Sequence, residues 1–335
     1  MNNIAINGFG RIGRLVFRAM INDPEINIVA INGSGDINTL VHLVRYDSVH
    51  GRCFDNIVAK DDETLIVNGK TIKRFNVRDP HELPWGDLNV DIIIEATGAF
   101  REKEKAQRHI DSGAKKVLIT APGKNEDITI VMGVNDEQYN PEKHHIISCA
   151  SCTTNCLAPI AKVLNDNFGF VQGFLTTTHS YTNDQMILDS PHKDLRRARA
   201  AALSIIPTST GAARAISRVM PEMEGKMDGV AFRVPTADGS LIDLSAILES
   251  EVTPEQVNAA VKEAAYGRMS GILYYTEDPI VQQDIVGNAH SSVFDTLQTM
   301  VMPAGKSNMV RCVSWYDNEW GYSNRVVDLA KILIP

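Results

Sequence analysis

A glycine-rich turn near the start of the chain limits the possible folds more than any other feature of the sequence. A short buried strand is predicted over residues 3–7, and it runs directly into Gly8, Gly10 and Gly13. An amphipathic helix follows, and a second buried strand is predicted over residues 26–31. Glycines at this spacing permit a tight turn and a close approach of the backbone to a pyrophosphate at the helix N-terminus. The chain is therefore predicted to begin with a dinucleotide-binding βαβ unit.

The end of the second strand bears on which dinucleotide is bound. Enzymes that use NAD usually place Asp or Glu there, about 20 residues beyond the glycines, to hold the ribose hydroxyls. This chain has Asn32, Gly33 and Ser34 instead, and its first carboxylate is Asp36. A carboxylate at the strand tip would repel a 2′-phosphate, whereas Gly33 leaves room and Ser34 can donate a hydrogen bond. The residues favour NADP; the alternative is that Asp36 or a backbone group holds the ribose of NAD. Arg78, in a loop, is either a solvated charge or a partner of the 2′-phosphate.

Strands and helices continue to alternate through the first 150 residues. Further strands are predicted at residues 64–67, 91–95, 116–120 and 129–132, with an amphipathic helix over residues 102–112. Such alternation indicates a parallel, doubly wound sheet. Ligands of these sheets collect where the strands end, here at Thr97 and Gly98 and again at Ala121.

The pattern of apolar and polar residues changes in the second half of the chain. Longer alternating runs are predicted as strands at residues 229–234, 241–248 and 309–316, and helices are predicted over 252–268 and 324–334. Alternation of this kind suits an antiparallel sheet with one covered face. The predicted fold class is α/β, a Rossmann-type doubly wound parallel sheet plus an α+β catalytic domain with a mostly antiparallel sheet. The predicted domains are 1–151 with 317–335, and 152–316.

A cysteine lies where a strand-like run, residues 145–148, passes into a helical pattern. The N-terminus of a helix stabilises a thiolate, so Cys152 is a candidate nucleophile. His179 follows the next apolar run and is its candidate base. The plainer alternative is a small buried cysteine beside a structural histidine. A zinc site built on Cys149, Cys152 and Cys156 lacks a nearby fourth ligand, so no metal is predicted.

Composition excludes several classes of protein. The chain has 335 residues, and Lys plus Arg minus Asp plus Glu is 33 − 41 = −8, which argues against general binding to nucleic acid or to an anionic membrane. No apolar run approaches the roughly 20 residues of a membrane span, and no signal-peptide core is present. Five cysteines, three of them clustered, favour free thiols in a reducing cytoplasm. The basic stretch around Lys193, Arg196 and Arg199 is either a solvated face or a site for phosphorylated substrates.

Four motifs together resemble the glyceraldehyde-3-phosphate dehydrogenase family. They are the segments 8–14 (GFGRIGR), 150–159 (ASCTTNCLAP), 179–182 (HSYT) and 315–319 (WYDNE), and the similarity runs along the whole chain. The resemblance implies that the Cys152 thiolate attacks the aldehyde of glyceraldehyde 3-phosphate while His179 acts as base. Hydride transfer to the cofactor would leave a thioester, which inorganic phosphate would attack. It also implies that the basic stretch reaches a neighbouring subunit of a homotetramer.

The resemblance also assigns binding residues. Thr182, Arg197 and Arg233 are similar to the site for the substrate's phosphate, and Ser151, Thr153, Thr210 and Gly211 to the site for the attacking phosphate, with Arg233 bordering both. Asn318 resembles the residue that fixes the nicotinamide amide, with Tyr322 beside it. The full set of predicted cofactor residues is Gly8, Gly10, Arg11, Ile12, Gly33, Ser34, Arg78, Thr97, Gly98, Thr120, Ser190, Asn318 and Tyr322.

Two departures from the common NAD-using pattern strengthen the NADP prediction. Gly33 stands where those members carry Asp, and Ser190 stands where many carry Leu. Bacterial members with such changes tend to work in the sugar-synthesising direction, so a gluconeogenic role is predicted. One alternative is a sister enzyme, erythrose-4-phosphate dehydrogenase, against which the second anion pocket argues. Another is a nucleotide-binding redox sensor that uses Cys152 only as a reactive thiol.

Overall fold

The computed structural model describes residues 2–53 and 56–333 and separates into two compact units. The first unit comprises Met1–Ile130, Glu137–Ala150 and Ser323–Pro335, and the second comprises Val131–Asp136 and Ser151–Tyr322. These bounds lie close to the predicted domains but differ in three places. Residues 131–136 and Ser151 belong to the second unit, and the C-terminal return to the first unit begins at residue 323 rather than 317.

The first unit contains a nine-stranded sheet in the order β10-β11-β9-β8-β1-β2-β7-β6-β5. Its strands are β1 (Asn2–Asn7), β2 (Ile26–Asn32), β5 (Ile57–Asp61), β6 (Thr64–Val67), β7 (Lys70–Phe75), β8 (Ile92–Glu95), β9 (Lys116–Ile119), β10 (Ile128–Thr129) and β11 (Ile146–Ser148). Its helices are α1 (Arg11–Met20), α2 (Ile37–Arg45), α3 (Lys103–Asp111) and most of α7 (Trp320–Leu333), and a small ribbon joins β3 (Tyr46–Asp47) to β4 (Gly51–Arg52).

The predicted parallel, doubly wound sheet is confirmed, with two corrections. The central strands pair in parallel and are buried on both faces, which explains their continuous apolar runs. Strand β6 instead runs antiparallel to both β5 and β7, because short hairpins connect it to each neighbour. The strand predicted over residues 129–132 reduces to the two residues of β10.

Close backbone packing explains two of the three glycines in the opening turn. Gly8 has φ +98, and a Cβ built on it would lie 2.5 Å from the backbone nitrogen of Thr97. A Cβ on Gly13 would lie 2.0 Å from the carbonyl oxygen of Gly8. Helix α1 therefore rests directly on the turn, and the turn rests on the end of β8. Only glycine permits both contacts without a shift of the backbone.

The second unit contains a seven-stranded sheet in the order β13-β14-β12-β15-β18-β17-β16. Its strands are β12 (Phe170–Ser180), β13 (Ile206–Ser209), β14 (Met227–Val234), β15 (Ser240–Val252), β16 (Leu273–Thr276), β17 (Ser292–Val301) and β18 (Ser307–Tyr316). Its helices are α4 (Cys152–Phe168), α5 (Ala212–Ala215) and α6 (Pro254–Tyr266). The 3₁₀ turns of the chain are Pro80–Glu82, Asp136–Gln138, Ala201–Leu203, Ile216–Arg218, Pro221–Met223 and Gln282–Ile285.

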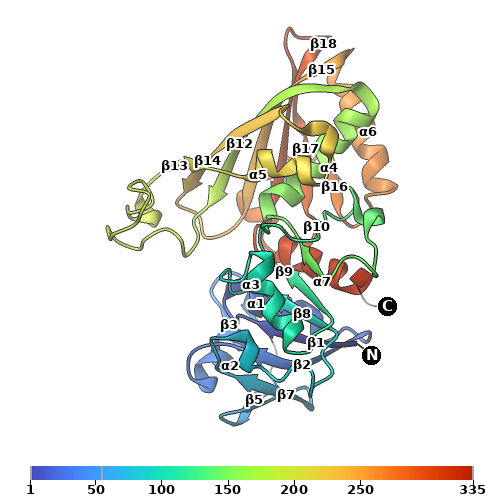
Figure 1. Ribbon diagram of the computed structural model, residues 1–335. Helices are drawn as coiled ribbons and strands as arrows, with labels where there is room; N and C mark the ends of the chain where they lie inside the picture. Colours follow the sequence, from blue (N-terminus) through green and yellow to red (C-terminus); the bar gives the residue numbers. More distant parts are fainter. Residues whose placement is uncertain (1, 54–55, 334–335) are drawn as a thin grey trace. The chain divides into compact units, whose positions relative to one another are not determined.

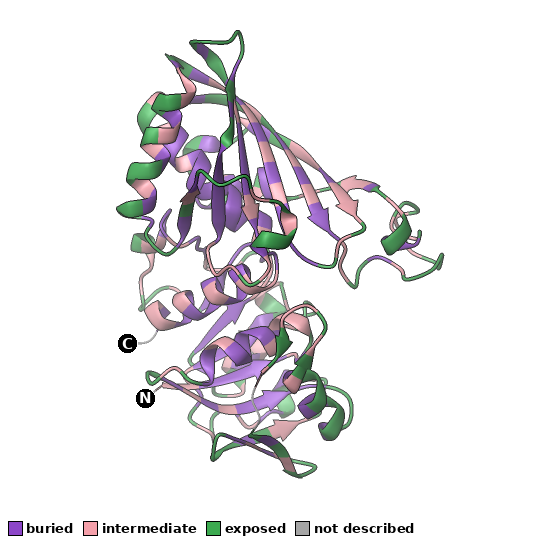
Figure 2. Cartoon of the chain, turned by 180° about the vertical axis from the view of Figure 1, so that it is seen from behind, coloured by how far each residue is buried: buried purple, intermediate pink, exposed green. Residues whose placement is uncertain are grey.

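The predicted mostly antiparallel sheet is also confirmed. Its only parallel pairs among the described residues are β12 with β14 and β16 with β17. Helices α4 and α6 pack against one face, and the strands alternate between buried and more exposed residues when seen from behind (Figures 1 and 2). Helix α4 continues through Pro159, whose neighbours on both sides are buried. Within the described residues, no helix is both long enough and apolar enough to span a membrane.

Candidate functional site

The candidate nucleophile occupies the first turn of helix α4. Ser151 is the N-cap residue, and its Oγ accepts a hydrogen bond from the backbone N–H of Thr154 at 3.0 Å. Ala150, just before the cap, has φ +55, a conformation that residues other than glycine seldom adopt. This turn connects the end of β11 to the helix, which begins at Cys152. The sulfur therefore lies at a helix N-terminus, as the sequence predicts.

His179 lies beside this sulfur at the end of β12. Its Nε2 is 3.5 Å from Cys152 Sγ. On its other side, Arg233 Nη1 lies 2.7 Å from His179 Nδ1 and donates to the carbonyl oxygen of Ser180 at 3.0 Å. The parallel pairing of β12 with β14 sets this geometry, because it places Arg233 directly opposite His179. Arg233 Nε is buried and has no hydrogen-bond partner among the described residues.

Burial and the nearby guanidinium keep the histidine uncharged. Together they lower the pKa of His179 to about 3. His179 Nδ1 lies 2.7 Å from both Arg233 Nη1, a donor, and the carbonyl oxygen of Ser180, an acceptor, so either tautomer of the neutral ring has a partner at Nδ1. With the proton on Nδ1 and donated to Ser180, Nε2 faces the sulfur as a base.

The electrostatics of the cysteine are balanced between opposing groups. Burial raises the pKa of Cys152 above its ordinary value, while the charge of Arg233 and the backbone N–H of Thr153 oppose that increase. The low thiol pKa expected from the helix N-terminus alone is thus opposed by burial. Burial also lowers the pKa of Arg233, which remains a cation because an arginine begins so far above neutrality.

The predicted anion-binding residues lie on several segments of the second unit. Arg197 is paired with Asp184, and its Nε donates to Thr208 Oγ1 at 2.9 Å. Its charge also contributes to lowering the pKa of Arg233, after the larger effect of burial. Two guanidinium groups that repel each other make a site that an anion would stabilise. Among the described residues, Thr182, Thr210 and Gly211 make no recorded hydrogen bond to either arginine. Thr182 Oγ1 instead contacts Gln185 at 3.4 Å, and Thr210 Oγ1 accepts a hydrogen bond from the backbone N–H of Ala212 at 3.2 Å. Gly211 is the N-cap residue of α5.

The predicted pyrophosphate site lies at the start of α1. Gly10 is the N-cap residue, and a Cβ built there would meet no atom within 4 Å, so the space above the turn is open. Arg11 and Ile12 supply the first N–H groups of the helix, which have no partner within a helix. The Arg11 side chain itself forms a paired contact with Asp47, at 2.9 and 3.1 Å. These features fit a bound dinucleotide whose pyrophosphate contacts the backbone.

Other predicted cofactor residues lie at the carboxyl ends of neighbouring strands. Thr97 donates its backbone N–H to the Glu95 carboxylate at 2.8 Å, and Gly98 has φ +73. Thr120 donates its hydroxyl to the carbonyl oxygen of Glu95 at 3.1 Å. Strands β8 and β1 are adjacent at the point where the strand order reverses. Ligands of doubly wound sheets bind at this point.

The tip of β2 differs from its expected geometry in two ways. A Cβ on Gly33 would lie 2.7 Å from Phe9 Cβ, so the position is not simply open space. Asp36 accepts hydrogen bonds from the Thr39 hydroxyl and from the backbone N–H groups of Thr39 and Asn38, which lower its pKa to about 2 and make it the cap of α2. Ser34 is exposed, as the sequence argument requires.

Two arginines lie near this tip. Arg78 is exposed and makes no ion pair among the described residues. The preceding residue, Val77, is held by the side chain of Asn32, at 3.0 Å for its N–H and 2.8 Å for its carbonyl oxygen. Arg74 was not predicted, and its Nη2 donates to the carbonyl oxygens of Gly33 and Gly35. Its role follows from the pairing of β7 with β2, which the local sequence does not specify.

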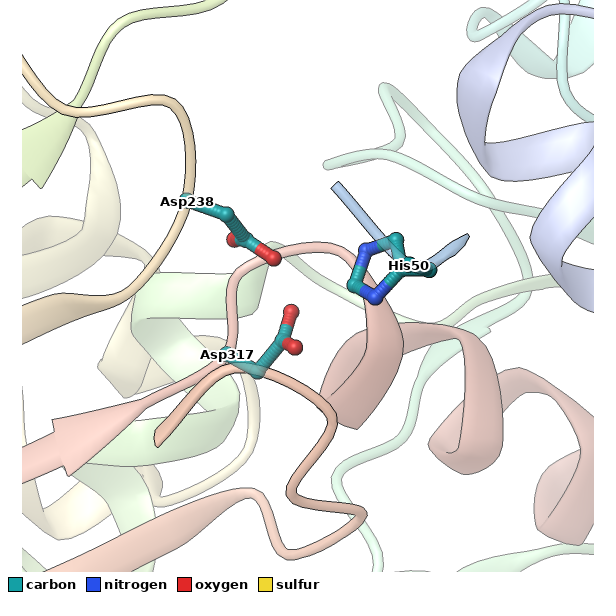
Figure 3. A group of neighbouring side chains, drawn as sticks. All are labelled: His50, Asp238 and Asp317. Carbon is teal, nitrogen blue, oxygen red and sulfur yellow. The ribbon is translucent and has the colours of Figure 1, made fainter. Parts of the chain in front are cut away.

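The residues assigned to the nicotinamide lie in the second unit. Asn318 is buried and accepts a hydrogen bond from Ser240 Oγ at 2.6 Å, and Tyr322 is buried. Ser190, predicted from the NADP preference, lies in the long segment between β12 and β13. Beside Asn318, the buried carboxylates of Asp317 and Asp238 point toward each other (Figure 3). Burial and the repulsion of Asp238 raise the pKa of Asp317 to about 7. Neither aspartate was predicted, because only the fold brings them together.

Comparison with known proteins agrees with this arrangement. The family model described as "Glyceraldehyde 3-phosphate dehydrogenase, NAD binding domain" matches residues 2–103, and the model of the C-terminal domain of the same family matches residues 151–318. The chain belongs to the glyceraldehyde-3-phosphate dehydrogenase family. A relative named "Glyceraldehyde-3-phosphate dehydrogenase" from Geobacillus stearothermophilus is 61% identical over 327 residues, covering 98% of this chain and 96% of the relative. "Glyceraldehyde-3-phosphate dehydrogenase 2" from Bacillus subtilis strain 168 is 56% identical over 328 residues, covering 98% and 95%.

The family assignment fixes the general class of the protein. It is an oxidoreductase with an NAD-binding Rossmann domain, as the glycine turn and parallel sheet predict. Cys152, His179 and Arg233 fall within the segment matched by the C-terminal model, and the glycine turn falls within the segment matched by the NAD-binding model. The resemblance stated from the motifs is thus confirmed at the level of the family.

The depressed pKa of His179 predicts how stability depends on pH. In the unfolded chain this histidine takes up a proton below about pH 6.5, whereas in the folded protein it stays neutral down to about pH 3. Its contribution to stability is therefore complete above pH 6.5 and is lost as the pH falls. We expect the unfolding free energy of the wild type minus that of His179→Asn to fall by about 1.4 kcal/mol per pH unit between pH 6 and 4. Urea unfolding over this range measures it, and a difference that does not change with pH would contradict a buried neutral imidazole.

Proposed function

We propose that the protein catalyses the reversible, phosphorylating oxidation of glyceraldehyde 3-phosphate to 1,3-bisphosphoglycerate. The observation that supports this proposal most strongly is that the side chains of Cys152, His179 and Arg233 lie in a row at the end of one sheet. The thiolate attacks the aldehyde carbon to give a thiohemiacetal, and His179 with the Cys152 backbone N–H stabilises the oxyanion. Bound NAD(P) supplies the acceptor for the hydride that this carbon must lose to become a thioester. Inorganic phosphate then attacks the thioester carbon and releases the thiolate.

The two phosphates of this reaction are proposed to bind at different sets of residues. Arg197 with Thr182 binds the phosphate of the substrate. Ser151, the backbone N–H of Thr153, Thr210 and Gly211 bind the attacking phosphate. Support comes from the buried Nε of Arg233, which has no hydrogen-bond partner among the described residues, and from the repulsion between the two guanidiniums. Arriving anions neutralise both charges. They also offset the positive charge of Arg233, which opposes protonation of His179, so the imidazole can accept the proton it must remove.

The reaction is tested by initial rates with glyceraldehyde 3-phosphate and either cofactor, with and without inorganic phosphate. We expect sustained turnover only with phosphate, because hydrolysis of the thioester is slow without it. Cys152→Ser should abolish turnover. Steady turnover that is independent of phosphate would contradict the proposal and indicate an aldehyde dehydrogenase that hydrolyses its thioester, as expected for erythrose-4-phosphate dehydrogenase.

We infer that NADP is the preferred cofactor and that NAD is also accepted. Asp36 is a helix cap rather than a residue at the strand tip, and it leaves Ser34 and Arg78 to face a 2′-phosphate. Arg74 adds a second positive charge next to Gly33. This preference, together with Ser190, supports a role in the sugar-synthesising direction. The five free thiols support a reducing, cytoplasmic location.

Removing the exposed guanidinium tests the cofactor preference. We expect Arg78→Ala to lower kcat/KM for NADP by about tenfold, the value of one charge-assisted hydrogen bond, and to leave kcat/KM for NAD nearly unchanged. Lys60→Ala removes an exposed charge elsewhere in the first unit and serves as the control. Equal losses with both cofactors would contradict a contact to the 2′-phosphate.

We also propose that the protein is a homotetramer. The segment between β12 and β13 extends away from the sheet of the second unit (Figure 1) and exposes Ile187, Leu195 and Leu203 by 89%, 81% and 80%. Apolar side chains so exposed mark an interaction surface, and a second copy of the chain is the proposed partner. Sedimentation equilibrium should give about four times the chain mass of 36.9 kDa. Leu195→Asp should dissociate the assembly, Val58→Asp on β5 should not, and a monomeric wild type would contradict the proposal.

A further inference from the structure

Three hydroxyl groups form a buried row behind the nucleophile. Tyr316 OH lies 2.9 Å from Thr153 Oγ1 and 3.1 Å from Thr177 Oγ1. Thr177 Oγ1 donates to the carbonyl oxygen of Leu241 at 3.0 Å. The three side chains come from α4, β18 and β12, and all three residues are at most 5% exposed. At the near end, Thr153 Oγ1 is 4.0 Å from Cys152 Sγ.

The direction of these hydrogen bonds follows from counting protons. A hydroxyl has one proton to donate, and Thr177 uses its proton on a carbonyl that can only accept. The contact between Tyr316 and Thr177 is then a hydrogen bond only if Tyr316 donates. Burial raises the pKa of Tyr316 well above its ordinary value, so this proton is retained. The contact between Thr153 and Tyr316 is in turn a hydrogen bond only if Thr153 donates.

We propose that Tyr316 and Thr177 are positioning residues that hold the Thr153 hydroxyl proton away from the Cys152 sulfur. The proton order is Thr153 to Tyr316, Tyr316 to Thr177, and Thr177 to the Leu241 carbonyl. Thr153 then presents lone pairs, not a donor, to the sulfur. The row fixes which groups stabilise the thiolate, and the Thr153 hydroxyl is not one of them.

Several charged or titratable groups also face the sulfur. His179 lies at the end of β12 and Arg233 at the end of β14, while Asp238 follows β14 and disfavours the thiolate. Cys156 lies one turn along α4, where burial raises its own pKa to about 12. None of these groups changes when the hydroxyl row is broken. An effect of breaking the row on the sulfur can therefore be assigned to Thr153.

Withholding this donor has a consequence for the chemistry. A hydrogen bond to a thiolate lowers both the pKa of the thiol and the nucleophilicity of the ionised sulfur. A sulfur that lacks this bond is the stronger nucleophile once it has ionised. This inference rests on Cys152 acting as the nucleophile of the proposed function, but its test needs neither substrate nor cofactor.

The test measures the pH dependence of Cys152 alkylation by iodoacetamide on the intact protein, with the modified residue verified by peptide mass spectrometry. Tyr316→Phe removes the acceptor of the Thr153 proton. Thr177→Val removes the acceptor of the Tyr316 proton, which then turns toward Thr153. Both changes free the Thr153 hydroxyl to donate to the sulfur. We expect the alkylation midpoint to fall by about 0.5–1 pH unit in both variants, the equivalent of one ordinary hydrogen bond.

Thr177→Ser keeps the hydroxyl and removes only a methyl group, so its midpoint should stay within about 0.2 units of the wild type. Midpoints that rise or stay constant in both Tyr316→Phe and Thr177→Val would overturn the proposal, and so would a Thr177→Ser shift as large as that of Thr177→Val. Thermal unfolding identifies a variant that fails to fold, and the two disruptive variants test the row independently. If the wild type shows no phosphate-dependent turnover, the proposed function is overturned, but the result of the alkylation experiment remains valid.

Discussion

The contact between a buried guanidinium and a buried imidazole governs the chemistry of this protein. Burial and the charge of Arg233, 2.7 Å away, keep the pKa of His179 low, so the imidazole beside Cys152 is neutral. A cysteine–histidine pair is often pictured as a thiolate beside an imidazolium. Here the positive charge belongs to Arg233. In the proposed reaction, the charge that attracts phosphate is also the charge that lowers the pKa of the base.

This arrangement depends on the sheet of the second unit. Parallel pairing of β12 with β14 places His179 opposite Arg233, and the antiparallel pairing of β15 with β18 brings Tyr316 beneath them. The ring of Tyr316 makes a T-shaped contact with the ring of His179, with ring centres 5.9 Å apart, and this contact restricts the position of the imidazole. The groups proposed to bind substrate and to transfer the proton thus share one sheet, and precise positioning requires such a support.

Local sequence was enough to predict some of this and not the rest. The strand–turn–helix around Gly8 and the helix start at Cys152 are local patterns, so both could be read from neighbouring residues. The pairing of His179 with Arg233 spans 54 residues of sequence and follows from strand register, which no local pattern specifies. The same holds for the contact of Gly33 with Phe9 and for the carboxylate pair Asp238–Asp317. The arginine at position 233 was placed by family resemblance, but its effect on the histidine needed the structure.

In the proposed reaction, the oxidation energy is held as a thioester on Cys152 until phosphate arrives. The decisive measurement is mass spectrometry of the intact protein, quenched in acid after mixing with glyceraldehyde 3-phosphate and cofactor without phosphate. We expect a mass increase equal to the phosphoglyceroyl group, confined to the Cys152 peptide, that disappears when phosphate is added before the quench. An unmodified Cys152 during cofactor reduction, or an adduct that survives phosphate, would contradict the proposed thioester.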